Sequence, residues 1–427
     1  MASGRTTNFN FPYPFSTDPV NVSGDIEQLA VSLDTFLEEN VTQESAANTL
    51  YVSKDGNDNN SGTSLSDAFL TIRAAAANAV AGTTIFVKSG DYTENNPVTI
   101  PARVAIVGDN LRTVTVRPAN RTADIFYVNN GCFVTGITFR DHLSPAAAFA
   151  FNPDGSAGNI FTSPYIQDCS SITTTGKGMY VDGSVVGGQR SMVLDAYTQF
   201  NEGGIGIHID NDGYAQLVSI FTICCEVGVL CTNGGYCSVT NSNSSFGTYG
   251  LKADGVGPVK LTGATNRTDQ VGTEIVIDGL AARPAVGNVV SFDGGTVFYT
   301  VASTTPLSNT QTTVTLIEEV ETPLPIDTPA TFHARSFIST SGHTFEYVGA
   351  GNILAQALPE TGGVPIQENE VVEENGGKVF YTSTDQWGDF RIGGDLTINR
   401  ADGTITGRTF DRSLFAVLTP YILAIEG

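Results

Sequence analysis

The chain has 427 residues, of which 41% are hydrophobic and only 15% are charged, and its formal net charge is −23. A nucleic-acid surface needs clustered Lys and Arg, so this charge excludes nucleic-acid binding and argues against docking on an anionic membrane. The length allows roughly two to four domains. The 46 glycines suit a chain whose strands stack through apolar and small polar side chains rather than through ion pairs.

Residues 1–47 differ in composition from the rest. An extended segment rich in Phe, Tyr and Pro precedes a short stretch with apolar residues at helical spacing. An amphipathic helix behind an extended aromatic segment is typical of a docking arm. The side chains expected to contact a partner are Phe11, Tyr13, Phe15, Leu29, Leu33 and Phe36.

The opening residues contain no apolar core of the length that a secretory signal requires. Later runs do not approach the ~18 consecutive apolar residues of a membrane span. We therefore expect a protein that is made in a cytoplasm and either stays there or is released by lysis.

Residues 48–257 contain short strands broken by Gly, Asn and Asp. Gly206, Gly228 and Gly250 each open a similar strand at intervals of 22 residues, and a looser copy begins at Gly178. A fixed period of this size predicts a solenoid, in which each repeat buries its apolar face only against its neighbours. The repeat has no helical stripe, so the expected fold is all-β, a parallel β-helix.

Two further features fit this solenoid. Residues 67–80 form the only strongly helical stretch of this half and are expected to cover the open edge of the first coil. The cysteines lie in apolar strands without zinc-type CxxC pairs, so we expect reduced thiols stacked in the core. They are Cys132, Cys169, Cys224, Cys225, Cys231 and Cys237.

The 22-residue period stops after residue 257. Residues 258–336 carry hairpin-length strands and predict a small antiparallel β-barrel or sandwich inserted between coils. Residues 337–427 would form a final coil followed by a β-rich segment for oligomerisation or attachment. Trp387, the only tryptophan, is either an interface anchor or an ordinary packing residue of that segment.

Carboxylates recur at one position of the repeat. Asp182, Asp210 and Asp254 share it, with Thr232 interrupting the series, so they should project from one line of turns. Carboxylates about 5–9 Å apart are what glycoside hydrolysis uses. Asp before Gly or Asn is also a turn signal in its own right, and we favour that interpretation.

Other candidate sites depend on residue type alone. Arg190, close in sequence to Asp195, is the best base within the coils for a polysaccharide lyase, although a surface arginine is the simpler interpretation. Asp55, Asn57 and Asp58 lie in an oxygen-rich loop, a weak calcium candidate that is more simply a turn. We expect no cofactor.

Three segments resemble known families. Residues 51–58 (YVSKDGND), continuing through 69–75 and 85–92, resemble the opening of the pectin-lyase-like right-handed parallel β-helix proteins. Residues 13–26 resemble the N-termini of phage tail proteins that dock on other virion components. Residues 380–395 (FYTSTDQWGDFRIGGD) resemble a segment of virion structural proteins from T4-like tailed phages of marine cyanobacteria.

The resemblance implies a virion component, namely a tail fibre, spike or baseplate-associated protein, made in the host cytoplasm. It implies a homotrimer that acts as a rigid, non-enzymatic spacer. Its partners would be other virion proteins, contacted through residues 1–47 and the C-terminal segment. Because the β-helix also hosts carbohydrate enzymes, the alternatives are a polysaccharide lyase or depolymerase, or a glycan-binding adhesin, acting on the host surface.

Overall fold

The computed structural model describes residues 48–341, 343–346, 371–381, 389–392, 396–399 and 404–407, together with residues 4–5, 12–13 and 31. In this part of the chain no helix is long and apolar enough to cross a bilayer. Tyr13 belongs to β2 (Pro12–Tyr13), which pairs antiparallel with β1 (Gly4–Arg5). The other proposed contact residues lie outside the described residues: Phe11, Phe15, Leu29, Leu33, Phe36 and Trp387.

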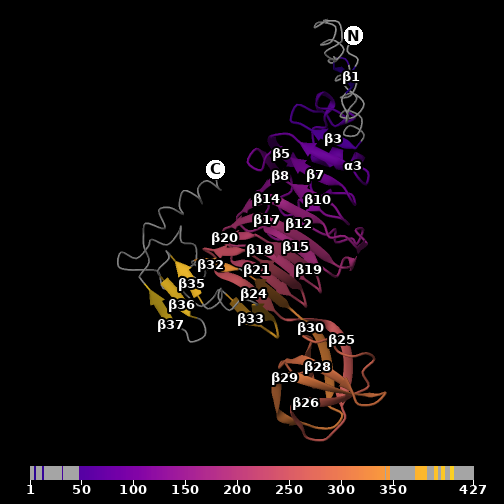
Figure 1. Cartoon of the computed structure of the whole chain (residues 1–427), viewed down its shortest axis with the longest axis vertical. Helices are drawn as coiled ribbons and strands as arrows, with labels where there is room; N and C mark the ends of the chain where they lie inside the picture. Colours follow the sequence, from indigo (N-terminus) through magenta and orange to yellow (C-terminus); the bar gives the residue numbers. More distant parts are fainter. Residues whose placement is uncertain are drawn as a thin grey trace.

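A parallel β-helix forms the body of the molecule, as predicted (Figure 1). Its first ladder contains, in spatial order, β3 (Thr49–Val52), β4 (Thr84–Val87), β7 (Ala105–Gly108), β10 (Phe133–Thr135), β14 (Tyr165–Thr173), β17 (Ser191–Asn201), β19 (Tyr214–Val218), β22 (Tyr236–Thr240), β31 (Phe337–Ser341) and β34 (Lys378–Tyr381). Neighbouring strands of this ladder pair in parallel, one from each coil.

Two further ladders complete the coils. The second contains β5 (Gly90–Glu94), β8 (Val114–Pro118), β11 (Thr138–Arg140), β20 (Phe221–Ile223), β23 (Asn243–Ser245) and β32 (Thr344–Glu346), with β14 and β17 long enough to join both. The third contains β6 (Val98–Thr99), β9 (Phe126–Tyr127), β12 (Ala147–Ala150), β15 (Lys177–Asp182), β18 (Ile205–Asp210), β21 (Val227–Thr232), β24 (Tyr249–Asp254) and β33 (Val371–Glu374). A short side pair joins β13 (Asn159–Ile160) to β16 (Gly187–Gly188).

Side chains at equivalent positions stack along the interior. Ile106, Val134, Ile166, Leu194 and Leu217 are consecutive partners in the first ladder, and each is fully buried. Burial of one such side chain stabilises the fold by roughly 1.5–3 kcal/mol, and every coil contributes several. None of the six cysteines, all of which lie in the described residues, forms a disulfide, and all are buried, as predicted, which makes them part of this core.

A short helix covers the start of the solenoid. The helix α3 (Ile72–Asn78) buries Ile72, Ala75 and Ala76, and it follows a 3-10 turn, η2 (Leu65–Asp67). The predicted helix over 67–80 was therefore too long at both ends. Before the helix the chain is extended, and Phe69 forms a parallel β-bridge with Val52. Thr71 then caps the helix, its side chain accepting the amide of Ala74.

A small closed barrel interrupts the solenoid, as predicted. Its strands are β25 (Val256–Thr265), β26 (Gln270–Asp278), β27 (Val289–Phe292), β28 (Tyr299–Pro306), β29 (Gln311–Leu324) and β30 (Pro329–Arg335), closed in the order β25-β26-β29-β28-β27-β30. It has its own apolar core, which includes Ile277, Val301 and Phe332. Figure 1 shows the barrel at the end of the solenoid opposite to α3.

The last described strands form a separate antiparallel group: β35 (Asp389–Ile392), β36 (Leu396–Asn399) and β37 (Thr404–Gly407).

Candidate functional site

The carboxylates that share a repeat position lie in one row. Asp182 of β15 pairs with Asp210 of β18, and Thr232 of β21 pairs with Asp254 of β24. Asp254 in turn pairs with Glu374 of β33. The row lies at the ends of the third-ladder strands, where each strand enters a turn, because the coils are in register there.

Asp210 is hydrogen-bonded on all sides by its own chain. Its Oδ1 accepts the Thr232 hydroxyl at 2.7 Å and the Asn233 side-chain amide at 2.8 Å. Its Oδ2 accepts the Tyr180 hydroxyl at 3.1 Å and the Asn211 side-chain amide at 3.3 Å. The residue is only 8% exposed. A carboxylate engaged in this way fastens neighbouring turns and has no lone pair left for a substrate.

Asp182 is held in the charged form. Burial raises the pKa of its carboxyl, but hydrogen bonds from Ser184, Asn211 and Tyr180 outweigh burial and leave the pKa below its usual value. Burial and the two carboxylates raise the pKa of the Tyr180 phenol well above its usual value, so this group stays a donor. A general acid needs the opposite shift in its pKa, so Asp182 is poorly suited to protonate a leaving group.

His208 extends the same network. Its Nε2 lies 2.7 Å from Thr232 Oγ1, and because that hydroxyl gives its proton to Asp210, Nε2 is the donor. Burial lowers the pKa of His208 to about 4. The imidazole is therefore neutral near pH 7 and packs against the Tyr180 ring at a centroid distance of 5.1 Å.

Arg190 and Asp195 belong to different contacts. Arg190 Nη1 lies 3.6 Å from Asp212 Oδ2, and Lys260 of the barrel contacts the same oxygen. Asp195 lies in the first ladder, where it accepts the Tyr165 hydroxyl at 2.9 Å. The two residues therefore contact different partners, Arg190 at the turn beside the barrel and Asp195 within the first ladder.

The oxygen-rich loop is closed by its own amides. Asp58 Oδ1 accepts the backbone N–H groups of Leu70 and Thr71, each at 2.9 Å, and Oδ2 accepts the Thr71 hydroxyl. Asn57 Oδ1 accepts the amide of Asn59, and the amide of Asp55 donates to Ser53 Oγ. Over the described ranges no group of three or more His, Cys, Asp or Glu is placed to hold a metal ion.

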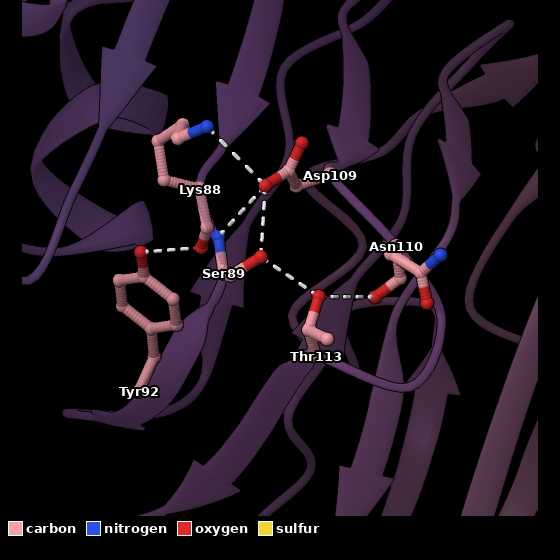
Figure 2. Close-up of polar contacts among 6 residues, drawn as sticks. All are labelled: Lys88, Ser89, Tyr92, Asp109, Asn110 and Thr113. Atoms are coloured by element: carbon pink, nitrogen blue, oxygen red, sulfur yellow. Dashed lines mark hydrogen bonds and ion pairs between the residues drawn. The ribbon is translucent and has the colours of Figure 1, made fainter.

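Figure 2 shows a second polar cluster, which the sequence analysis did not predict. Ser89 Oγ lies 2.8 Å from both Asp109 Oδ2 and Thr113 Oγ1. Lys88 Nζ lies 3.3 Å from the same Asp109 oxygen, and the Tyr92 hydroxyl donates to the Lys88 carbonyl at 2.7 Å. Hydrogen bonds from Ser89 and Lys88 lower the pKa of Asp109, which makes it a weak base. The cluster ties the turn after β4 to the turn after β7 in the next coil.

A shallow pocket of about 160 Å³ opens on the second ladder. Its apolar lining is Ile172 and Phe200, with Thr173 and Thr174 beside them. Its charged lining is Arg121, Arg140, Asp141 and Glu202. The pocket could not be predicted from the sequence, since its residues come from several coils at unequal spacing. The adjacent pair Arg140 and Asp141 was its one local sign.

A family model described as "Protein of unknown function (DUF1565)" matches residues 54–116. This segment contains the Asp58 loop, α3 and the cluster of Figure 2. No curated protein matches the chain at a significant level.

Several solved structures are similar to the chain. A pectin methylesterase in complex with a hexasaccharide is 16% identical, over 46% of this chain and 69% of the other, with a TM-score of 0.31. A rhamnogalacturonan lyase is 13% identical, over 48% and 72% of the two chains, with a TM-score of 0.31. The ORF18 protein of Geobacillus virus E2 is 10% identical, over 93% and 90%, with a TM-score of 0.24. Similarity at this level carries no information on activity.

Proposed function

We propose that this chain is a rigid, non-enzymatic spacer of a tailed-phage virion: a tail fibre, spike or baseplate-associated protein that acts as a homotrimer. The observation that carries the proposal is the continuity of the first ladder. Tyr236 of β22 pairs with Phe337 of β31 although the whole barrel lies between them in sequence. A shaft that transmits force needs such uninterrupted hydrogen bonding between coils, and the insertion leaves it intact.

Side-chain stacking supports the same role. The rings of Tyr214 and Tyr236 stack with centroids 5.1 Å apart, and those of Tyr236 and Phe337 with centroids 5.5 Å apart. The aromatic ladder thus also crosses the insertion. The faces of these rings are occupied by one another, so they strengthen the shaft and offer little surface for stacking on a ligand.

The use of the carboxylates also favours a structural role. Asp58, Asp109 and Asp210 each accept two or more hydrogen bonds that join one segment of the solenoid to another. The place in a virion is supported by the resemblance of residues 13–26 and 380–395 to phage tail proteins. Partners would be neighbouring virion proteins bound through residues 1–47 and the C-terminal segment.

The solution mass of the purified protein, measured by light scattering after size exclusion, tests the trimer. We expect a mass near three times 45.0 kDa. Removal of residues 382–427 should give a monomer, whereas the matched removal of residues 1–47 should leave the trimer. A monomeric full-length chain would contradict the proposed assembly.

Location and activity need their own measurements. Antibodies against the barrel should label the tails of intact phage particles, and labelling of no virion would contradict the structural role. Incubation with host-surface polysaccharides should release no new reducing ends. Release that is abolished by Asp182→Ala or Arg190→Ala would instead establish the depolymerase alternative.

A further inference from the structure

The pocket on the second ladder has an apolar floor built by strand register. Arg140 of β11 pairs with Ile172 of β14, and Ile172 pairs with Phe200 of β17. Three successive coils therefore place these residues side by side across the sheet. Phe200 is only 3% exposed, so it offers a small apolar edge rather than an open ring face.

Ion pairs and a hydrogen bond next to the pocket fix two of its charged lining residues, Arg121 and Asp141. Arg117 forms ion pairs with both Asp91 and Asp141. Arg121 Nε donates to the backbone carbonyl of Asp141 at 2.6 Å. The Asp141 carboxylate is thus neutralised from behind, and its backbone fixes the guanidinium of Arg121 beside the opening.

Two of the charged groups remain available to a ligand. Among the residues that the structure describes, the Arg121 side chain makes no hydrogen bond other than the one from Nε to the Asp141 carbonyl. Glu202 is exposed, and its carboxylate has no hydrogen bond or ion pair with that same part of the chain. The two Nη groups of Arg121 and the carboxylate oxygens of Glu202 therefore line one opening as an unused donor group and an unused acceptor group.

From these features we propose that the pocket binds a single neutral hexopyranose unit of a glycan, through its hydroxyl groups. The volume of about 160 Å³ is well below the ~300 Å³ at which sites for drug-sized ligands begin, so one ring is the largest unit it holds. Carboxylate and guanidinium groups satisfy hydroxyl donors and acceptors in turn, while Ile172 and Phe200 contact the C–H groups of the ring.

The charges around the pocket and the net charge of the chain both favour binding of a neutral sugar over an acidic one. In and behind the lining, the three guanidinium groups of Arg117, Arg121 and Arg140 are balanced by three carboxylates, those of Asp91, Asp141 and Glu202. The whole chain carries −23, so an anionic polymer approaching the shaft is repelled over a long range. The inference is independent of the proposed virion role, and it would give a structural shaft a contact with a sugar-coated surface.

Saturation-transfer NMR on the full-length protein tests the inference, with methyl glucoside, methyl galactoside, methyl mannoside and methyl galacturonoside as probes. We expect transfer to at least one neutral glycoside, with a dissociation constant on the order of 1 mM or weaker, as befits a shallow site. The galacturonoside should show no transfer. Absence of transfer to all three neutral probes, or stronger binding of the galacturonoside, overturns the proposal.

Variants locate the site. Glu202→Gln and Arg121→Gln should each weaken binding at least about tenfold, the effect of losing one charge-assisted hydrogen bond. Glu226→Gln is the matched control, because Glu226 is an exposed carboxylate one coil further along that accepts the Thr248 hydroxyl away from the pocket. Equal weakening by the control, or unchanged binding in both pocket variants with an unchanged melting temperature, would place the sugar elsewhere and refute the assignment.

Discussion

The Thr232 hydroxyl donates a 2.7 Å hydrogen bond to Asp210 of the preceding coil. That bond belongs to a network in which Tyr180, Asn211 and Asn233 also donate to Asp210. Each donor comes from a turn or strand of a neighbouring coil or from the next residue, so one carboxylate holds several segments in register. Its loss would leave several donors of the turns without an acceptor.

Replacement of Asp210 by Ala should therefore lower the free energy of unfolding by roughly 3 kcal/mol, since buried donors left without partners are costly. Asp254→Ala is the matched control, because Asp254 occupies the same row but is part-exposed and pairs with Lys252 and Asn375. The control should cost less than about 1 kcal/mol. Urea denaturation measures both, and equal losses would contradict the structural role assigned to Asp210.

The buried histidines predict acid sensitivity. Burial lowers the pKa of His142 from 6.5 to about 4, and that of His343 to about 3. In the unfolded chain these imidazoles take up protons near pH 6.5, whereas in the folded chain they stay neutral. The free energy of unfolding therefore decreases as pH falls from about 6.5 to 4. The shift at His142 corresponds to about 3 kcal/mol.

Urea midpoints measured at pH 7 and pH 4.5 should show this loss. His142→Gln is expected to flatten the pH dependence, because glutamine carries no titrating group and its amide can still donate to the Lys177 carbonyl. His333→Gln is the control, since His333 lies in the barrel and is part-exposed. A His142 variant with the same pH dependence as the wild type would contradict the prediction.

Because of Glu94, we expect a contribution to stability that depends on pH in the opposite direction. Its fully buried carboxylate accepts the amides of Ile72 and Arg73 at the start of α3. Burial raises its pKa above the usual value despite those hydrogen bonds. The folded state thus binds the proton more tightly than the unfolded state, and stability falls as pH rises through the folded pKa.

Glu94→Gln removes this titration while its carbonyl still accepts one amide. The variant should therefore gain stability relative to the wild type as pH is raised from about 4.5. Chemical denaturation across pH 4 to 8 measures the difference between the two proteins. A stability gap that does not change with pH would show that Glu94 has the same proton affinity in both states.

Much of the fold could be predicted because the interior positions repeat. Gly206, Gly228 and Gly250 lie on adjacent strands, and the 22-residue interval between them is the length of one coil in that region. The row of Asp182, Asp210 and Asp254 followed from the same register. Earlier coils vary in length: Ile85 and its partner Ile106 are 21 residues apart, whereas Phe133 and its partner Tyr165 are 32 apart, so no fixed period was visible there in the sequence.

The rest of the site depends on contacts that no local pattern encodes. Arg190 contacts Asp212 rather than Asp195, and Lys260 of the inserted barrel, 70 residues away from Arg190 in sequence, contacts the same carboxylate. The pocket combines Arg121, a loop residue, with Glu202, which follows β17. Their proximity arises from coil stacking, whereas spacing in the sequence differs from coil to coil.

The barrel should be removable without loss of the solenoid. The two ends of the insertion meet: Ser336 N–H donates to the Gly255 carbonyl at 3.0 Å, and Ser336 Oγ donates to the Asp254 carbonyl at 2.8 Å. Deletion of residues 256–335 with a short Gly linker between Gly255 and Ser336 therefore leaves β22 beside β31. We expect the β-sheet circular dichroism of the solenoid to be kept and the melting temperature to change by only a few degrees.

A matched deletion of Tyr236–Thr240 removes β22, which pairs with β19 on one side and β31 on the other. This change breaks the ladder and should give an aggregated or unfolded chain, even though it removes far fewer residues. If the barrel deletion also unfolds the solenoid, the barrel is part of the shaft's stability and not an insertion that the ladder bypasses. Retained structure would instead show that the register between Tyr236 and Phe337 forms without it.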